Sequence, residues 1–279
     1  MSNEIEKGAL YVVGTPIGNL SDMTDRARNV LCGVDFVAAE DTRVSGKLLS
    51  VLGIKNSFVS YHEHNKASAG KGIVERLLSG QSGAIVTDAG MPAISDPGEE
   101  LVRLCKENGI KVIPVPGACA FVSALCASGM PSRRFCFEGF LPTDKKERQE
   151  VLSCYKNDKK TVIFYEAPHR LVKTLEAFLE SLGDRRVCLA RELTKLNEEI
   201  VVTTLKEALE LYKTKEPRGE YVIVIEGALQ DGTQSVFDSM TVQEHVEFYE
   251  KQGMKRMDAI KMCAKDRGVP KNEIYKHFI

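Results

Sequence analysis

The sequence predicts an α/β fold with two α/β domains and a small helical tail at its C-terminal end. In the first 120 or so residues, short apolar runs alternate with helical patterns, which indicates a mostly parallel sheet. Between residues 187 and 204, two strand-like runs follow one another without a helix, which indicates a mixed sheet. Beyond Gly227, glycine and proline separate three short helical segments. We expect three parts, which cover residues 1–121, 122–229 and 230–279.

The composition is that of an ordinary soluble globular protein. The 279 residues are 43% hydrophobic and 28% charged, enough for one or two domains with a full core. No apolar run has the length of a membrane helix, and the acidic N-terminal stretch lacks the basic start of a signal peptide, so we expect a cytoplasmic protein. The eight cysteines form no CxxC pair, which favours free thiols and no metal site.

The first expected strand, residues 10–13, ends at the turn GTPIGN. Its GxxxG spacing matches neither a dinucleotide fingerprint nor a P-loop, which disfavours an ordinary nicotinamide or nucleotide-triphosphate enzyme. A helix capped by Thr24 should follow. The second strand, residues 35–39, ends in the charged run Glu40, Asp41, Thr42 and Arg43 before a helix.

A third expected strand, residues 57–60, leads into the polar turn YHEHN and a helix. If the strand continues, His62 and His64 share a face and form a conceivable metal pair. A polar loop explains them equally well, because no third ligand is spaced to join them.

The fourth expected strand, residues 83–86, ends at the loop that organises the first domain. This loop holds Asp88, two glycines and two prolines, and we expect a helix to follow the start signal Ser95–Pro97. Loops at the carboxyl ends of strands bind ligands in open α/β sheets, and Gly90 lets the backbone approach one closely. A tight structural turn would select the same residue types.

The fifth expected strand, residues 111–115, leads into PGACA and a helix of small residues through Ala127. Small side chains at a helix start allow backbone N–H groups to reach a ligand, although close helix packing is an equally common cause. The second domain should begin with an extended aromatic run, residues 135–142, and a charged helix, residues 144–155. Its remaining strands are expected at residues 161–165, 187–190, 199–204 and 221–225.

The tail has a charge distribution unlike that of the whole chain, whose net charge is −1. Residues 251–279 carry eight basic side chains against three acidic ones, a surplus of five positive charges. Helices are expected at residues 241–251, 255–266 and 271–278, with Ala259 and Ile260 among the residues on the inner face. This helix-turn-helix-like pattern is typical of a nucleic-acid-binding module, and a solvated packing hairpin is the alternative.

Several long motifs in one order resemble the ribosomal small-subunit RNA methyltransferase I family of the tetrapyrrole (corrin/porphyrin) methylase superfamily. They are LYVVGTPIGNLSD (10–22), AAEDTR (38–43), HEHN (62–65), TDAGMPAISDPG (87–98), PVPGACA (114–120), FEGFLP (137–142), FYEAPHR (164–170), REL (191–193) and RGEYVIVIEG (218–227). The resemblance implies two domains of the tetrapyrrole methylase type with S-adenosylmethionine in the cleft between them. It also implies methylation of the ribose 2′-hydroxyl of a cytidine in the decoding region of 16S rRNA in the small ribosomal subunit, and a homodimer.

On matching positions, the resemblance places the cofactor against turns from both domains. The implied contacts are Pro16, Ile17, Asp88, Ala89, Gly90, Ala93, Ile94, Cys119, Ala120, Tyr165, Glu220 and Tyr221. Related small-molecule methylases carry a GDP-type sequence where this chain has Asp88-Ala89-Gly90, a departure that fits the RNA branch.

Methyl transfer to a ribose hydroxyl needs alignment of the reacting atoms and is helped by a base. The candidates for that base are Glu40, Asp41, Glu166 and His169, each of which could instead be a helix cap or an ion-pair partner. Arg43, Arg170 and Arg191 are plausible phosphate contacts because guanidinium groups are forked donors. Two other functions stay open: methylation of a small tetrapyrrole-like molecule, and a non-catalytic RNA-binding assembly factor.

Overall fold

The computed structural model describes residues 4–228, 240–251, 254–267 and 269–278. The chain forms two compact units, residues 1–227 and 228–279. The first unit contains two five-stranded sheets, and the second contains short helices. None of the helices within the described ranges is long and apolar enough to cross a membrane.

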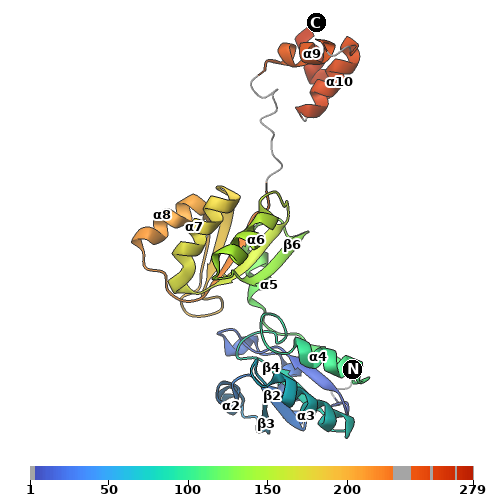
Figure 1. The fold of residues 1–279 in the computed structure, drawn as a ribbon, viewed down its shortest axis with the longest axis vertical. Helices are drawn as coiled ribbons and strands as arrows, with labels where there is room; N and C mark the ends of the chain where they lie inside the picture. The colour runs from blue at the N-terminus through green and yellow to red at the C-terminus, as the bar shows by residue number, and fades with distance from the viewer. Residues whose placement is uncertain (1–3, 229–239, 252–253, 268, 279) are drawn as a thin grey trace. The chain divides into compact units, whose positions relative to one another are not determined.

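The first sheet is entirely parallel, as the alternating pattern predicted, with the order β3-β2-β4-β1-β5 (Figure 1). Its strands are β1 (Leu10–Val13), β2 (Phe36–Ala39), β3 (Phe58–Ser60), β4 (Gly83–Val86) and β5 (Val112–Val115). Three of these strands, β1, β2 and β4, are buried at every residue, which explains their continuous apolar sequences. The carboxyl ends of the five strands meet at one edge, where the loops of β4, β1 and β5 are neighbours.

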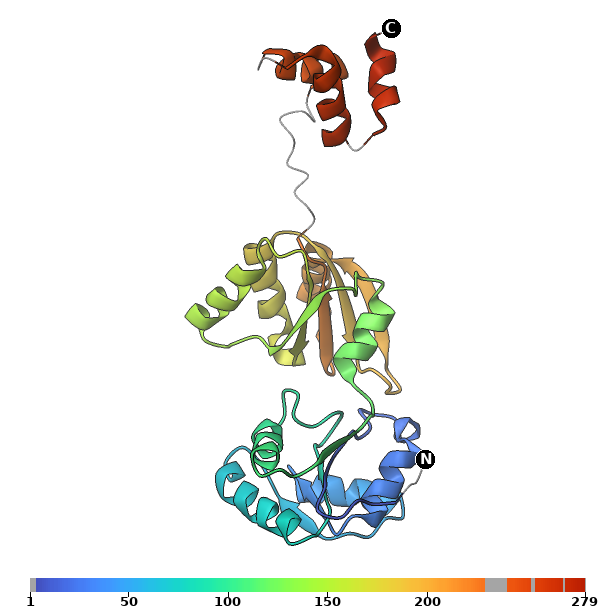
Figure 2. The ribbon, with the colours of Figure 1, turned by 90° about the vertical axis from the view of Figure 1, so that its right-hand side faces the viewer.

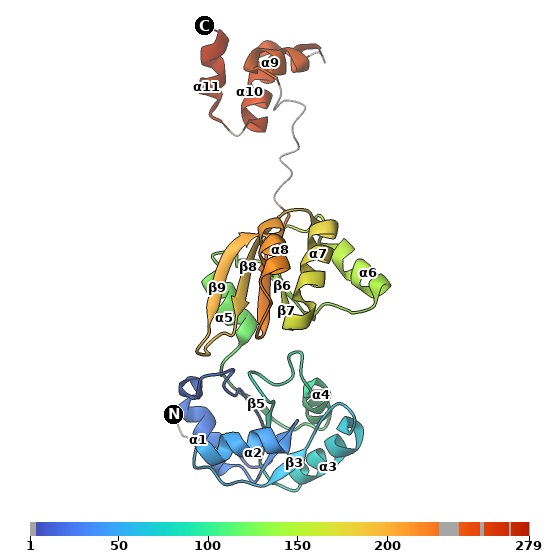
Figure 3. The same cartoon turned by 90° about the vertical axis from the view of Figure 1, so that its left-hand side faces the viewer.

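Helices cover both faces of this sheet (Figure 3). Tyr11 and Val13 point toward α1 (Asp25–Gly33) and α2 (Thr42–Val51), whereas Leu10 and Val12 point toward the two other helices. Those helices are α3 (Lys66–Leu78) and α4 (Glu99–Glu107), and the short 3-10 helix η1 (Leu20–Asp22) precedes α1. The predicted Thr24 cap is confirmed, since its hydroxyl accepts a hydrogen bond from the backbone N–H of Ala27.

The second sheet is mixed, as predicted, with the order β6-β7-β10-β8-β9. Only β6 and β7 are parallel neighbours, and the other pairs are antiparallel. Its strands are β6 (Phe135–Phe140), β7 (Thr161–Glu166), β8 (Arg186–Arg191), β9 (Glu199–Thr204) and β10 (Tyr221–Ile225).

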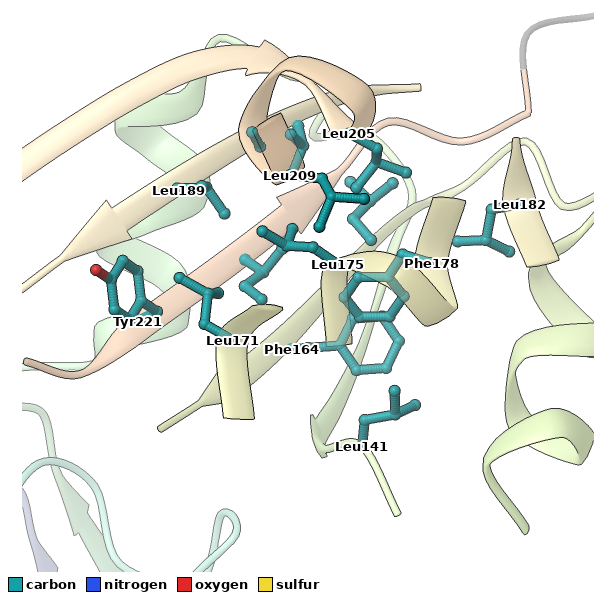
Figure 4. Close-up of a cluster of buried hydrophobic side chains, with 14 of the residues drawn as sticks. Leu141, Phe164, Leu171, Leu175, Phe178, Leu182, Leu189, Leu205, Leu209 and Tyr221 are labelled. Carbon is teal, nitrogen blue, oxygen red and sulfur yellow. The ribbon is translucent and has the colours of Figure 1, made fainter. Parts of the chain in front are cut away.

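The two faces of the second sheet are covered unequally. On one face, β7 and β10 contribute Phe164 and Ile223 to a large apolar cluster with three helices (Figure 4). These helices are α6 (Lys145–Tyr155), α7 (Leu171–Leu182) and α8 (Leu205–Thr214). The other face packs against α5 (Ala120–Ser128) through Ala124 and Leu125. Figure 2 shows α5, in green, on the opposite side of the sheet from α6 and α7.

Three expectations about local structure were wrong or incomplete. The helix after β4 does follow Ser95–Pro97, but these residues do not cap it: α4 begins at Glu99, and its N-cap is Gly98, which has no side chain. The strand β3 ends at Ser60, so His62 and His64 lie in a turn closed by the Asn65 side chain and not on a strand face. The helix α8 was missed, although its buried residues follow the helical spacing i, i+3, i+4 and i+7.

The second unit contains the three expected helices, α9 (Val242–Lys251), α10 (Arg256–Asp266) and α11 (Lys271–Tyr275), and a final 3-10 helix, η3 (Lys276–Phe278). Ala259, Ile260, Cys263 and Ala264 lie together in its buried core, as their spacing on one helix face predicted. Val246 and Ile274 complete this core from the neighbouring helices, so the unit has an apolar centre of its own. The acidic residues Asp231 and Asp238, which precede α9 in the sequence, lie outside the described residues.

Candidate active site

The loops after β1 and β4 are joined to each other by a pair of backbone hydrogen bonds. The N–H of Thr15 donates to the carbonyl of Gly90 at 2.9 Å, and the N–H of Gly90 donates to the carbonyl of Thr15 at 3.2 Å. The Thr15 hydroxyl also donates to the carbonyl of Thr87 at 3.2 Å. Gly90 has φ +89°, a backbone conformation that favours glycine. These hydrogen bonds therefore hold the two loops together as one rigid surface.

The loop after β5 packs against the first turn through two glycines. A Cβ added to Gly14 would lie 2.7 Å from the Cα of Gly117, and a Cβ added to Gly117 would lie 2.8 Å from the Cα of Gly14. This backbone contact admits no side chain on either residue. The contact brings the start of α5, at Cys119 and Ala120, next to the surface formed by the loops after β1 and β4.

A cavity lies between these loops and the ends of the strands in the second sheet. Its empty volume, including the space open to solvent, is about 910 Å³. It is lined by Ile17, Ala89, Gly90, Met91, Ile94, Asp96, Cys119, Ala120, Phe140, Tyr165, Glu166, Ala167, Ala190, Glu192, Leu193, Lys195, Glu220, Tyr221 and Val222. Most of these groups are apolar or small, and the charged ones are concentrated at the second sheet.

The charged part of the lining is an ion-pair network around Lys195. Its ammonium group lies 2.9 Å from a carboxylate oxygen of Glu192 and 2.9 Å from one of Glu220. The Glu192 carboxylate also accepts a hydrogen bond from the backbone N–H of Glu220, and this bond and Lys195 lower the pKa of Glu192. The lysine side chain crosses over Gly18, where an added Cβ would lie 2.4 Å from Cγ of Lys195. Lys195 thus connects the second sheet to the first turn.

Nine of the twelve expected cofactor contacts line this cavity. They are Ile17, Ala89, Gly90, Ile94, Cys119, Ala120, Tyr165, Glu220 and Tyr221. Pro16, Asp88 and Ala93 lie in the same loops but outside the lining. The carboxylate of Asp88 accepts a hydrogen bond from the backbone N–H of Asp41 at 3.3 Å, so it links the loops after β2 and β4.

The four candidate bases have different surroundings. Glu166 lines the cavity, but one of its oxygens accepts from the Ala167 N–H at 2.9 Å and the other accepts from the Thr174 hydroxyl at 2.5 Å. The hydroxyl of Thr87 donates to Glu40 at 3.1 Å, and Glu40 lies outside the lining.

The other two candidates also lie outside the lining. Asp41 caps α2, and its hydrogen bonds with Arg43 keep the pKa of its carboxyl far below the ordinary value. His169 is exposed in the 3-10 helix η2 (Pro168–Arg170). Among the described residues, no group of three or more histidine, cysteine, aspartate or glutamate side chains is placed to hold a metal ion.

The three arginines expected to contact phosphate already pair with acidic side chains. Arg43 lies 2.6 Å from Asp41, and its side chain is 88% exposed. Arg170 lies 3.2 Å from Glu166 and donates to the carbonyl of Leu141. Arg191 lies 3.0 Å from Glu199 on the neighbouring strand. Arg43 is the most accessible of the three.

Several lining residues were not expected from the sequence. Met91 and Asp96 belong to the loop after β4, and Phe140 lies at the end of β6. Glu192, which is part of the quoted REL motif, and Lys195 belong to the hairpin between β8 and β9. The signal that could have found them is their position at strand ends, because every lining loop follows or precedes a strand.

Comparisons with known proteins agree with this architecture. Residues 9–209 match the family described as tetrapyrrole (corrin/porphyrin) methylases. Two solved structures share the fold. Uroporphyrin-III-C-methyltransferase from Thermus thermophilus superposes with a TM-score of 0.55 at 20% identity, over 78% of this chain and 94% of that one. A cobalt precorrin-4 methyltransferase superposes with a TM-score of 0.56 at 20% identity, over 78% of this chain and 95% of that one.

Relatives of higher identity cover nearly the whole chain. Proteins named ribosomal RNA small subunit methyltransferase I are 48% identical in Halalkalibacterium halodurans, over 97% of this chain and 94% of that protein, and 48% identical in Bacillus subtilis, with the same coverage. The protein of that name from Escherichia coli O157:H7 is 43% identical over 99% of this chain and 96% of its own length. The chain therefore belongs to the tetrapyrrole (corrin/porphyrin) methylase family, and within it to the ribosomal RNA small subunit methyltransferase I group.

Proposed function

We propose that this protein is an S-adenosylmethionine-dependent methyltransferase that methylates the ribose 2′-hydroxyl of a cytidine in the decoding region of 16S rRNA. The observation that carries the proposal is the cavity between the two sheets, in a chain related over nearly its whole length to proteins named as small-subunit rRNA methyltransferases. Methyl transfer is the activity that both the family description and the names of the relatives state.

The lining fits the chemistry of S-adenosylmethionine. Small residues such as Ala89 and Gly90 offer bare backbone and an apolar surface for a flat adenine ring. Aromatic rings at Phe140 and Tyr165 suit a positively charged sulfonium. The start of α5 at Ala120 has no side-chain cap, so its N–H groups are suited to a carboxylate. When bound, S-adenosylmethionine supplies an activated methyl group.

The second unit supports an RNA substrate. Lys255, Lys271 and Lys276 are exposed, as is the ring of Tyr275, which is 42% accessible. Exposed lysines on the same unit as an exposed aromatic ring suit a polynucleotide, because the lysines attract phosphate and the ring can stack on a nucleobase. We include in the proposal that this unit contacts rRNA, that the enzyme acts in the cytoplasm, and that it forms a homodimer. The predicted boundaries at residues 121 and 229 also remain part of this proposal.

A second candidate is methylation of a small tetrapyrrole-like molecule, because the solved structures with this fold carry names of that kind. An assay with radiolabelled S-adenosylmethionine, purified small ribosomal subunits and a corrin precursor separates the candidates. Label in 16S rRNA, recovered after digestion as 2′-O-methylcytidine, supports our proposal. Label in the precursor alone supports the second candidate. Binding of subunits without any transfer indicates an assembly factor with an inactive cleft.

A further inference from the structure

Phe140 is an exposed aromatic side chain in the cavity lining. It is 54% exposed, whereas the other aromatic side chains of the lining, Tyr165 and Tyr221, are more buried. Ile94, from the loop after β4, lines the same cavity and is 40% exposed. Apolar surface that stays accessible beside a cavity commonly marks a binding site. Phe140 and Ile94 therefore form an apolar surface at the mouth of the cavity, to which both sheets contribute.

A β-bulge in β6 turns Phe140 toward the cavity. The register of β6 against β7 shifts between Phe137 and Gly139, so that Glu138 is an extra residue in the strand. Because side chains alternate between the two faces of a strand, residues 137 and 140 would point to opposite faces without the bulge. With the bulge, the rings of Phe137 and Phe140 both contact Tyr165, at centroid distances of 4.9 and 5.8 Å. Bulges commonly redirect side chains next to active sites.

The segment that carries Phe140 is supported from both sheets. Gly139 has φ +67°, a backbone conformation that favours glycine. A Cβ added to Gly139 would lie 2.9 Å from the hydroxyl oxygen of Ser95, so the loop after β4 packs directly against the bulge. Next to Phe140 in the second sheet, the ring of Phe137 stacks on that of Phe121 in α5, with centroids 4.3 Å apart. Phe140 is therefore attached to a rigid segment while its ring stays accessible.

The proposed reaction requires a nucleotide to enter the cavity at this mouth. A ribose 2′-hydroxyl reaches a methyl donor inside a cavity only when its nucleotide leaves the base stack of the RNA. Nucleobases that leave the stack are held on aromatic side chains in many RNA-binding proteins. Among the aromatic rings of the lining, that of Phe140 is the most accessible, so an arriving base can cover it.

We propose that Phe140 holds the target nucleotide, whose nucleobase stacks on its ring at the mouth of the cavity. This inference rests on the proposed function and deepens it, because it names a residue that positions the acceptor. Stacking stabilises the nucleotide outside the RNA stack, so that its ribose hydroxyl stays next to the methyl donor. Since every nucleobase has a flat π-face, this contact increases the rate of transfer and does not select cytosine.

The test compares the full-length protein with Phe140→Leu and Phe140→Tyr. Phe135→Leu is the matched control, because Phe135 is exposed on the same strand and lies outside the cavity lining. For each protein, calorimetry measures the affinities for S-adenosylmethionine and S-adenosylhomocysteine, and rapid mixing measures the single-turnover rate of methyl transfer at saturating small subunits. The rate is measured on subunits with an intact target cytidine and on subunits reconstituted with an abasic ribose at that position.

We expect Phe140→Leu to transfer methyl about 10- to 100-fold more slowly to intact subunits, because stacking of one base on an aromatic ring has a free energy of that order. Phe140→Tyr keeps the aromatic face and should stay within about threefold of the wild type. On abasic subunits, Phe140→Leu should match the wild type, because no base is left to stack. The affinities for S-adenosylmethionine and S-adenosylhomocysteine should not change, and Phe135→Leu should match the wild type throughout.

Other results overturn the inference. A Phe140→Leu rate equal to that of the wild type, a Phe140→Tyr rate as low as that of Phe140→Leu, or the same loss of rate on abasic subunits would each show that the ring does not stack on the base. Weaker binding of S-adenosylmethionine with unchanged binding of S-adenosylhomocysteine would show that the ring contacts the sulfonium instead. Weaker binding of both would show that Phe140 maintains the shape of the cavity.

The wild-type protein separates failure of this inference from failure of the proposed function. If the wild type transfers no methyl to 16S rRNA in intact subunits, the proposed function fails and the inference fails with it. If the wild type methylates the rRNA and Phe140→Leu does so at the same rate, only the inference fails.

Discussion

Replacing Glu166 tests whether this buried carboxylate anchors the structure or takes part in chemistry. Its side chain is 0% exposed, and its two oxygens accept from the Ala167 N–H, the Thr174 hydroxyl and the Arg170 guanidinium. These bonds fix the turn between β7 and α7. We therefore expect Glu166 to act as an anchor.

The structure gives the size of the effect. Glu166→Gln keeps the shape and one acceptor oxygen but loses the charge opposite Arg170. Since a hydrogen bond to a charged group contributes about 1.5–3 kcal/mol, we expect a loss of about 2 kcal/mol. Glu166→Ala leaves three donors without their acceptor and should cost about 3–5 kcal/mol. For a folded unit of this size, the first loss corresponds to a fall in Tm of about 4–8 °C.

The assay is thermal and urea unfolding, followed by circular dichroism, together with methyl transfer at a temperature well below the transition. Glu180→Gln is the matched control, because it changes an exposed glutamate of α7, the helix that carries Thr174, and should stay within about 0.5 kcal/mol of the wild type. Glu166→Gln protein that is as stable as the wild type but cannot transfer methyl would refute the anchoring role and restore Glu166 as a candidate base.

Three further predictions concern the cavity loops and the second unit. Gly117→Ala should weaken S-adenosylmethionine binding at least about tenfold by calorimetry, because its Cβ would overlap the backbone of the first turn. The double change Lys271→Ala and Lys276→Ala should weaken subunit binding and flatten its salt dependence, by about 0.7–0.9 in log–log slope per lost phosphate contact. Asp96→Asn should raise stability by about 1 kcal/mol at pH 8 and by much less at pH 4, because the folded-state pKa of Asp96, about 6, exceeds the unfolded value and the penalty on the charged form grows as the pH rises.

Each of these predictions has a control in the same chain. Gly72 lies in α3 with no atom within 4 Å of an added Cβ, so the Gly72→Ala protein should bind the donor normally. Lys206→Ala with Lys213→Ala removes the same charge from α8, and subunit binding that falls equally in both double variants would contradict a specific role of the second unit. A stability gain for Asp96→Asn that is the same at pH 4 and pH 8 would show that its charge is not the cause.

Most of the fold was predictable because its elements follow local patterns. The five apolar runs of the first half became neighbouring parallel strands, and the successive runs at residues 187–204 became antiparallel β8 and β9. The N-cap of α4 was mispredicted because Ser95 and Asp96 look like capping residues, whereas tertiary packing holds them in the loop.

The site was harder to predict from the sequence because it depends on contacts between distant segments. The family resemblance implied that Ile17, Gly90 and Cys119 contact one ligand, and the structure puts all three on the cavity. Asp96 and Lys195 could not be ranked, because the burial of one and the ion pairs of the other involve residues far away in the sequence.

The uncapped start of α5 has a consequence for the lifetime of the protein. Because no side chain caps the backbone N–H groups beside Cys119, the protein without ligand lacks contacts that a bound anion could supply. A ligand present at 100 times its Kd adds about 2.7 kcal/mol to the folded state. Resistance to proteolysis should therefore increase with the concentration of the methyl donor, so that starvation for methionine would shorten the survival of this protein before it limits the reaction.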